Sequence, residues 1–146
     1  MKLVVDASVA VKWFLPESPR EADADLAVLL LRAVQGGQVD LLQPPHWLAE
    51  VAAVITRLRP EIAGEAIDLL DAMELETTAD AEVYKHASRL AKQLDQHLFD
   101  TLYHALALES EAVLITADDR YLRKARRLGR IAALDEWTPP ADAPAK

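Results

Sequence analysis

The chain has 146 residues, 51% of them apolar, so it has the length of one domain and enough apolar side chains for a single core. The absence of cysteine excludes disulfides, thiolate zinc sites and a cysteine nucleophile, and agrees with a reducing compartment. The formal net charge of −8 argues at first against a nucleic-acid partner, because phosphate-binding proteins usually carry a net basic surface.

Predicted strands alternate with predicted helices along the whole chain. In chain order we expect a strand over 2–6, helices over 7–15 and 22–34, a strand over 39–42, helices from 44 to about 58 and from 60 onward, a strand over 75–78, helices over 79–94 and 99–109, a strand over 112–116, a helix over 119–128 and a strand over 131–134. This order predicts an α/β fold in three layers, with a parallel sheet covered by helices on both faces.

The predicted domain covers residues 1–138, and the tail 139–146, rich in Pro and Ala, is expected to be disordered. No uncharged apolar stretch is long enough to span a bilayer. Asp6 also interrupts the N-terminus before a signal-peptide core could form. We therefore expect a cytoplasmic protein.

Four acidic residues interrupt four apolar segments that lie far apart in the chain. They are Asp6, Glu50, Asp100 and Asp118. A carboxylate among side chains that favour burial must be hydrogen-bonded, protonated or bound to a cation, because desolvating a bare charge costs several kcal/mol or more. If the fold brings the four together, their mutual repulsion favours a divalent metal held by oxygen ligands.

The predicted fold allows such a meeting. Asp6 ends the first strand and Asp118 follows a later one, so both lie at the carboxyl edge of the sheet, where ligands bind in open parallel sheets. Glu50 shares a helix face with Trp47 and Val54 and is expected to point inward. Asp100, near the start of its helix, can reach the same edge.

Each of these residues also has a purely structural interpretation. Asp6 and Asp118 could cap helices, and Asp100 could be a first-turn carboxylate favoured by the helix dipole. Glu50, flanked by apolar residues, has no capping role. Ser8 and Thr116 suit turn or cap hydroxyls.

The four histidines show no metal-binding spacing and fit ordinary surface or packing positions. The exception is His104, one helical turn beyond Asp100, which could orient that carboxylate.

A basic segment follows the last acidic position. It contains six of the sixteen Lys and Arg residues: Arg120, Arg123, Lys124, Arg126, Arg127 and Arg130. A solvated helix face explains such a run. Its position beside the acidic residues also makes Arg120, Arg123, Lys124 and Arg127 candidates for contact with nucleic-acid phosphates.

Four stretches together resemble the PIN-domain family, in order and over nearly the whole chain. They are Val4-Val5-Asp6-Ala7-Ser8-Val9, Pro45 to Ala52, Phe99 to Ala107, and Leu114 to Leu122. Within that family the short chain is similar to the VapC toxins of toxin–antitoxin pairs. No single stretch is specific, but four in register are.

The resemblance implies an Mg²⁺- or Mn²⁺-dependent endoribonuclease that acts as the toxin of a type II toxin–antitoxin system. Asp6, Glu50, Asp100 and Asp118 would be the catalytic acids, with metal held by Asp6, Asp100 and Asp118. Asp119 would be an additional acid, and Ser8 and Thr116 would support the ligands. The family often has Asn three residues after the Glu, where this chain has Ala53; this departure concerns a supporting hydrogen bond and not the metal ligands.

The resemblance also implies partners: a cognate antitoxin that inserts a segment into the acidic groove, an RNA substrate and a second copy of the chain. Trp13, Phe14, Leu15 and the helix over 22–34 offer apolar surface for such contacts, although burial in the core explains them more simply.

Two other classes of protein remain open. A catalytically silent PIN-like module that binds RNA or protein needs only the fold, although all four acids are present. A phosphatase of the haloacid dehalogenase type needs a second Asp two residues after the first, where this chain has Ser8.

Overall fold

The computed structural model describes residues 1–15 and 23–141. In chain order its main elements are β1 (Lys2–Val5), α1 (Ala7–Ala10), the 3₁₀ helix η1 (Val11–Trp13), α2 (Ala24–Gln35), β2 (Asp40–Gln43), α3 (Trp47–Leu58), α4 (Pro60–Ala72), β3 (Glu76–Thr77), α5 (Ala81–Leu94), α6 (Leu98–Glu109), β4 (Val113–Thr116), α7 (Asp119–Ala125), the 3₁₀ helix η2 (Arg126–Leu128), β5 (Ile131–Ala133) and the 3₁₀ helix η3 (Leu134–Glu136). None of these described helices is long and apolar enough to cross a membrane.

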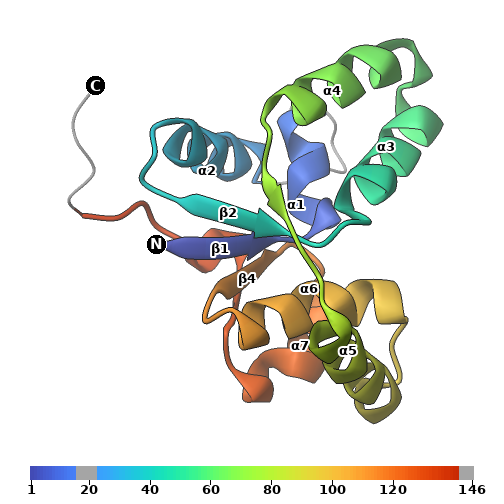
Figure 1. Cartoon of the computed structure of the whole chain (residues 1–146). Helices are drawn as coiled ribbons and strands as arrows, with labels where there is room; N and C mark the ends of the chain where they lie inside the picture. The colour runs from blue at the N-terminus through green and yellow to red at the C-terminus, as the bar shows by residue number, and fades with distance from the viewer. Residues whose placement is uncertain (16–22, 142–146) are drawn as a thin grey trace.

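The five strands form one parallel sheet in the order β3-β2-β1-β4-β5. Figure 1 shows α1 and α2 on one face of the sheet and α5, α6 and α7 on the other, while α3 and α4 form a helical pair at one end. The predicted α/β class, with a parallel sheet between two helical layers, is therefore confirmed. Because β1 lies between β2 and β4, the strand order reverses next to it, and ligands are expected at such a switch point.

The core is centred on β1 and α6. Leu3, Val4 and Val5 of β1 are almost completely buried, and α6 is buried continuously from Thr101 to Ala107. α6 packs between the sheet and α5, where the hydroxyl of Thr101 donates to the carbonyl of Ala87 at 2.8 Å. A helix enclosed on both sides holds its first turn firmly, and that turn carries Asp100.

The predicted elements are present, with shorter or shifted ends. The helix predicted over 7–15 consists of α1 followed by η1, and the one over 119–128 consists of α7 followed by η2. Proline starts α4 at its first position, and Gly36-Gly37 ends α2, with Gly37 at φ +78°. The position predicted to stop the first helix, 16, and residue 22 lie outside the described residues, as do 142–146 of the predicted tail.

The apolar residues considered for partner contact lie mainly in the core. Trp13 and Leu15 are buried, and the indole nitrogen of Trp13 donates to the carbonyl of Ala27 in α2 at 2.9 Å. Burial in this chain's own core therefore accounts for these two side chains. Phe14 is partly buried against the same core.

Candidate active site

Two of the four acids are placed by neighbouring strands. Asp6 follows β1 and Asp118 lies two residues beyond β4, and the two strands pair in parallel with Val5 opposite Ile115. The backbone amide of Asp6 continues this pairing by donating to the carbonyl of Ile115 at 3.0 Å. Both acids therefore emerge at the same edge of the sheet.

A buried amide fixes the strand just before Asp6. The side chain of Gln43 donates to the carbonyl of Val5 at 2.8 Å and accepts from its amide at 2.7 Å. Gln43 thus replaces a strand partner where β2 turns away from β1 toward β3. Sequence reasoning missed this residue; its polar side chain at the end of an apolar strand was the available signal.

Two helices bring the other two acids to the same place. Glu50 comes from α3 and Asp100 from the first turn of α6. A cleft of about 390 Å³ is lined by all four predicted acids, together with Ala7, Ser8, Val11, Lys12, Val54 and Ala117. The structure therefore gathers Asp6, Glu50, Asp100 and Asp118 at one cleft.

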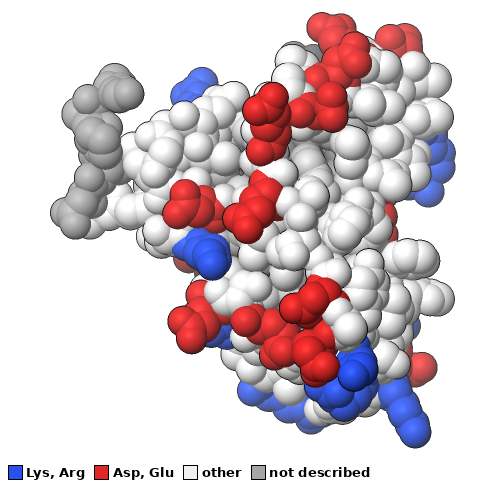
Figure 2. Space-filling model, in the orientation of Figure 1, with Lys and Arg blue, Asp and Glu red and all other residues white. Residues whose placement is uncertain are grey.

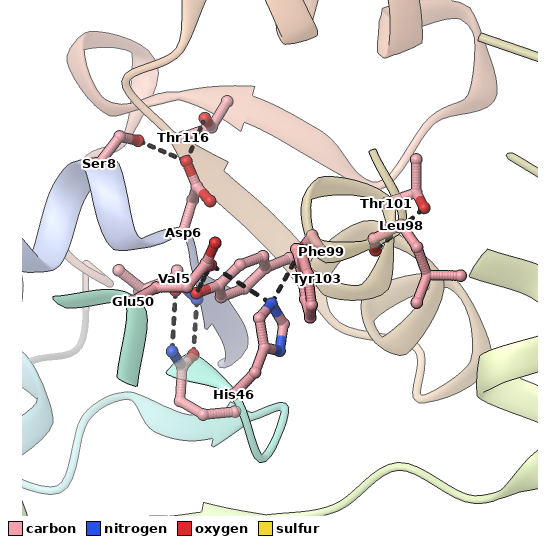
Figure 3. Close-up of polar contacts among 11 residues, drawn as sticks. Val5, Asp6, Ser8, His46, Glu50, Leu98, Phe99, Thr101, Tyr103 and Thr116 are labelled. Carbon is pink, nitrogen blue, oxygen red and sulfur yellow. Dashed lines mark hydrogen bonds and ion pairs between the residues drawn. The ribbon is translucent and has the colours of Figure 1, made fainter. Parts of the chain in front are cut away.

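Asp6 is held by the two hydroxyls that the sequence suggested. Ser8 Oγ and Thr116 Oγ1 donate to Asp6 Oδ2 at 2.5 and 3.2 Å, as Figure 3 shows. The same hydroxyls accept from the backbone amides of Ala117 and Asp118, both at 3.0 Å. These contacts tie the ends of β1 and β4 together around one carboxylate.

Glu50 is held by an aromatic hydroxyl that sequence reasoning missed. Tyr103, fully buried in α6, donates from its hydroxyl to Glu50 Oε1 at 2.7 Å. Burial and the surrounding carboxylates raise the pKa of Tyr103, so the phenol keeps its proton and remains a donor. His46 Nε2 lies 3.3 Å from the same oxygen. The signal available was a tyrosine three residues after Asp100 on the same helix.

Asp100 is held by Gln96, which is itself held by Lys124. Sequence reasoning also missed these two contacts. Gln96 Nε2 donates to Asp100 Oδ2 at 3.1 Å, while Gln96 Oε1 accepts from Lys124 Nζ at 2.8 Å. Lys124 also donates to the carbonyl of Asp95 at 3.1 Å. The lysine therefore orients the amide of Gln96 so that its NH₂ group faces the carboxylate.

Asp118 is a helix cap as well as a cleft residue. Its Oδ1 accepts from the amide of Tyr121 at 3.0 Å at the start of α7. The structural interpretation of Asp118 thus holds alongside its place in the cleft, because one oxygen caps the helix and the other remains for the cleft.

Two predicted residues lie elsewhere. Asp119 is exposed and lines a separate cavity of about 230 Å³ instead of the four-acid cleft. The suggestion that His104 orients Asp100 is wrong: its Nδ1 lies 3.0 Å from the hydroxyl of Tyr121 and its Nε2 lies 2.8 Å from the carbonyl of Gly129. Both ring nitrogens are therefore engaged on the α7 side of the core.

The negative charges of the carboxylates in the cleft repel one another. Burial, together with the charges of Glu50, Asp100 and Asp118, raises the pKa of Asp6 from 3.8 to about 6, although the hydrogen bond from Ser8 lowers it. Burial and the charges of Glu50 and Asp118 likewise raise the pKa of Asp100. A bound cation would relieve this repulsion.

The donor set fits a hard divalent cation in its chemistry, because all four groups are carboxylates. Among residues 1–15 and 23–141, however, no three acidic or histidine side chains stand together in an arrangement ready to hold a metal ion. The carboxylates line one cleft without converging on one point.

The basic segment is divided between structural and exposed side chains. Besides Lys124, Arg126 pairs with Glu136, and Arg130 donates to the carbonyl of Glu111. Arg120, Arg123 and Arg127 are exposed and make no hydrogen bond or ion pair with the part of the chain that the structure describes. Figure 2 shows Lys and Arg atoms gathered along the lower edge of the molecule, in the region of α5 and α7.

Comparison with known proteins agrees with this fold. The model of the PIN domain family matches residues 3–128. No curated protein sequence matches the chain. Among solved structures, a chain of the crystal structure of VapBC2 from Rickettsia felis bound to a DNA fragment from their promoter is similar in fold, with a TM-score of 0.67 and 14% identity over 94% of this chain and 100% of that one. The protein belongs to the PIN domain family.

Proposed function

We propose that this protein is a metal-dependent endoribonuclease that acts as the toxin of a type II toxin–antitoxin system. The observation that carries the proposal is the cleft lined by Asp6, Glu50, Asp100 and Asp118, which come from four separate elements of a PIN fold. PIN domains are typically nucleases that use divalent metals. The fold similarity to a chain of VapBC2 supports the narrower assignment to a toxin.

The proposed roles follow from the contacts of each carboxylate. Asp6, Asp100 and Asp118 would hold the metal, and each has one oxygen engaged by the protein and a second available to the cleft. Glu50, held by Tyr103, orients the attacking water. Bound Mg²⁺ or Mn²⁺ would lower the pKa of a bound water and neutralise charge that develops on the phosphate. In the reaction, a bond would form between the water oxygen and phosphorus while one P–O bond to ribose breaks. The water would lose a proton and the departing ribose oxygen would gain one, so that a phosphate monoester and a free hydroxyl result.

The partners follow from the same site. RNA phosphates meet the exposed Arg120, Arg123 and Arg127, of which Arg120 lines a second cavity together with Asp100 and Asp118. These cations offset the overall negative charge of the protein. Lys124, also predicted to contact RNA, donates to Gln96. A cognate antitoxin that places an Arg or Lys in the acidic cleft would compete with the metal. A second copy of the chain remains part of the proposal.

Expression in a bacterium without an antitoxin tests the proposal. We expect the wild-type protein to slow growth and to generate new internal RNA ends, mapped by sequencing after brief induction. The Asp6→Ala protein should do neither, whereas Asp119→Ala, which removes an acid outside the cleft, should behave as wild type. RNA ends that appear equally with Asp6→Ala would refute nuclease activity and leave a silent binding module in its place.

A further inference from the structure

Phe99 is an aromatic side chain in the first turn of α6 that lies outside the hydrophobic core. It is 58% exposed, although most apolar residues of this helix are fully buried. Single exposed apolar residues are common and need no explanation by themselves. Phe99, however, directly precedes Asp100, which lines the acidic cleft.

The ring of Phe99 belongs to an aromatic row that leads to the cleft. Its centroid lies 5.5 Å from the ring of His46, and His46 lies 4.7 Å from the ring of Tyr103. Tyr103 in turn donates to Glu50. The row therefore runs from the molecular surface to a carboxylate of the cleft.

A hydrogen bond fixes the outer end of this row. His46 Nε2 lies 2.8 Å from the carbonyl oxygen of Phe99, so the imidazole N–H donates across from the start of α3 to the first turn of α6 (Figure 3). The same nitrogen lies 3.3 Å from Glu50 Oε1. The two contacts of His46 therefore join Glu50 of α3 to the first turn of α6, which carries Asp100.

We propose that Phe99, backed by His46, is the stacking surface for one unpaired base of the RNA substrate. The inference rests on the proposed nuclease function and deepens it by assigning a binding site for a nucleobase. Proteins recognise single-stranded RNA by stacking splayed bases on aromatic side chains, and each such contact is sequence-tolerant. A base beside the scissile phosphate would reach Phe99 because the ring lies 5.5 Å from the ring of His46, whose Nε2 is 3.3 Å from Glu50 Oε1 in the cleft.

The surroundings favour a base over a protein partner. The other large apolar side chains exposed in the described residues are Met1, Leu29, Leu69 and Tyr84, and none belongs to α3 or α6. Phe99 is thus the one large apolar side chain of α3 and α6 that is exposed, since Leu98 beside it is partly buried against the core. A protein interface would need a continuous apolar centre.

Binding of single-stranded RNA tests the inference. The probes are RNA dodecamers that carry 2-aminopurine at successive positions, because the fluorescence of this base falls when it stacks. Measurements use Mg²⁺ and an Asp118→Asn background that limits cleavage. We expect Phe99→Ala to weaken binding about 5- to 150-fold, the range that corresponds to one stacked base, and to abolish the fluorescence loss at one position.

Matched variants separate stacking from other effects. Phe99→Trp should restore binding and fluorescence loss, whereas the apolar but non-aromatic Phe99→Leu should not. Tyr84→Ala, which removes another exposed aromatic ring, should leave both unchanged, and thermal melting should show that every variant is folded. In the cleaving enzyme, Phe99→Ala should raise KM more than it lowers kcat.

Three results would overturn the inference. They are wild-type binding by Phe99→Leu, an equal loss with Tyr84→Ala, or RNA binding unchanged in Phe99→Ala while capture of an antitoxin is lost. Each leaves the nuclease proposal intact if wild-type protein still cleaves RNA. Failure of wild-type protein to bind or cleave any RNA would instead refute the proposed function itself.

Discussion

Asp6 is the residue on which the candidate site depends most. It is the first residue after the central strand, and Ser8 and Thr116 both donate to one of its oxygens. Those donors favour the ionised form, whereas burial and the three neighbouring carboxylates oppose it more strongly and raise the pKa to about 6. The charge of Asp6 at neutral pH is therefore held at a cost in stability.

This cost predicts a pH dependence of stability in the absence of metal. Because the pKa of Asp6 in the folded protein, about 6, lies above its ordinary value of 3.8, the folded state binds the proton more tightly than the unfolded state. The resulting stabilisation is complete below about pH 4 and is lost as the pH rises through about 6. Relative to Asp6→Asn, metal-free wild-type protein should lose about 1–3 kcal/mol of unfolding free energy across this range.

Urea unfolding in EDTA at pH 4 to 7.5 measures this difference. Asp119→Asn, an exposed acid outside the cleft, should retain the wild-type pH profile. Parallel pH profiles of wild type and Asp6→Asn would show that Asp6 titrates normally and that the cleft imposes no charge repulsion on it.

The sequence predicted the four carboxylates of the cleft better than the side chains that hold the site in place. An acidic residue within an apolar segment can be recognised from the sequence alone, and all four of these acidic residues line the cleft. Gln43, Gln96 and Tyr103 escaped prediction because each acts on a residue of another element or loop. The assignment of His104 to Asp100 failed for the related reason that helical spacing does not show which neighbours compete for a ring nitrogen.

At the scale of elements, α7 joins the acidic cleft to the basic segment. Asp118 caps its first turn, Lys124 reaches back to Gln96, and Arg123 lies exposed beside that lysine in sequence. One short helix therefore supports two carboxylates and presents cations to solvent. The run of charges predicted a basic helix. It did not predict which cations bind within the protein and which face solvent, because this depends on the position of the loop before α6.

Charge reversal in this element predicts a selective loss of RNA binding. Arg123→Glu with Arg127→Glu should weaken RNA affinity in a salt-dependent way, because these exposed side chains are assigned to phosphates. The slope of log Kd against log salt should become shallower, and the response of the melting temperature to Mn²⁺ should not change. Arg126→Glu with Arg130→Glu serves as the control, because both arginines already bind within the protein. An equal loss of affinity in the two double variants would mean that only net charge matters.

The amino-acid sequence predicted the type and the order of the elements more accurately than the residues at which they begin and end. Strand residues 113–116 and the buried helix α6 follow from branched and continuous apolar runs. The helix predicted over 7–15 instead changes to a 3₁₀ turn at Val11, where the chain packs against α2 and Trp13 reaches the carbonyl of Ala27. Such tertiary contacts leave no local trace in the sequence.

At the scale of the whole molecule, the parallel sheet explains why residues so far apart in the chain meet. Strands β1 and β4 are neighbours, so the acids that follow them share one edge, while α3 and α6 bring Glu50 and Asp100 from either side. The net charge of −8 is compatible with the proposed RNA substrate, because the proposed metal ion and the exposed arginines of the basic segment would act locally.

The central claim is that these carboxylates together hold a divalent cation. Thermal melting of metal-free protein titrated with Mn²⁺ tests it most directly, since a ligand of the folded state raises the melting temperature by mass action. We predict a rise for wild-type protein that is largely absent in Asp6→Asn with Asp100→Asn and fully retained in Asp119→Asn with Asp135→Asn, two exposed acids outside the cleft. An equal rise in wild type and in the Asp6 and Asp100 double variant would contradict the claim.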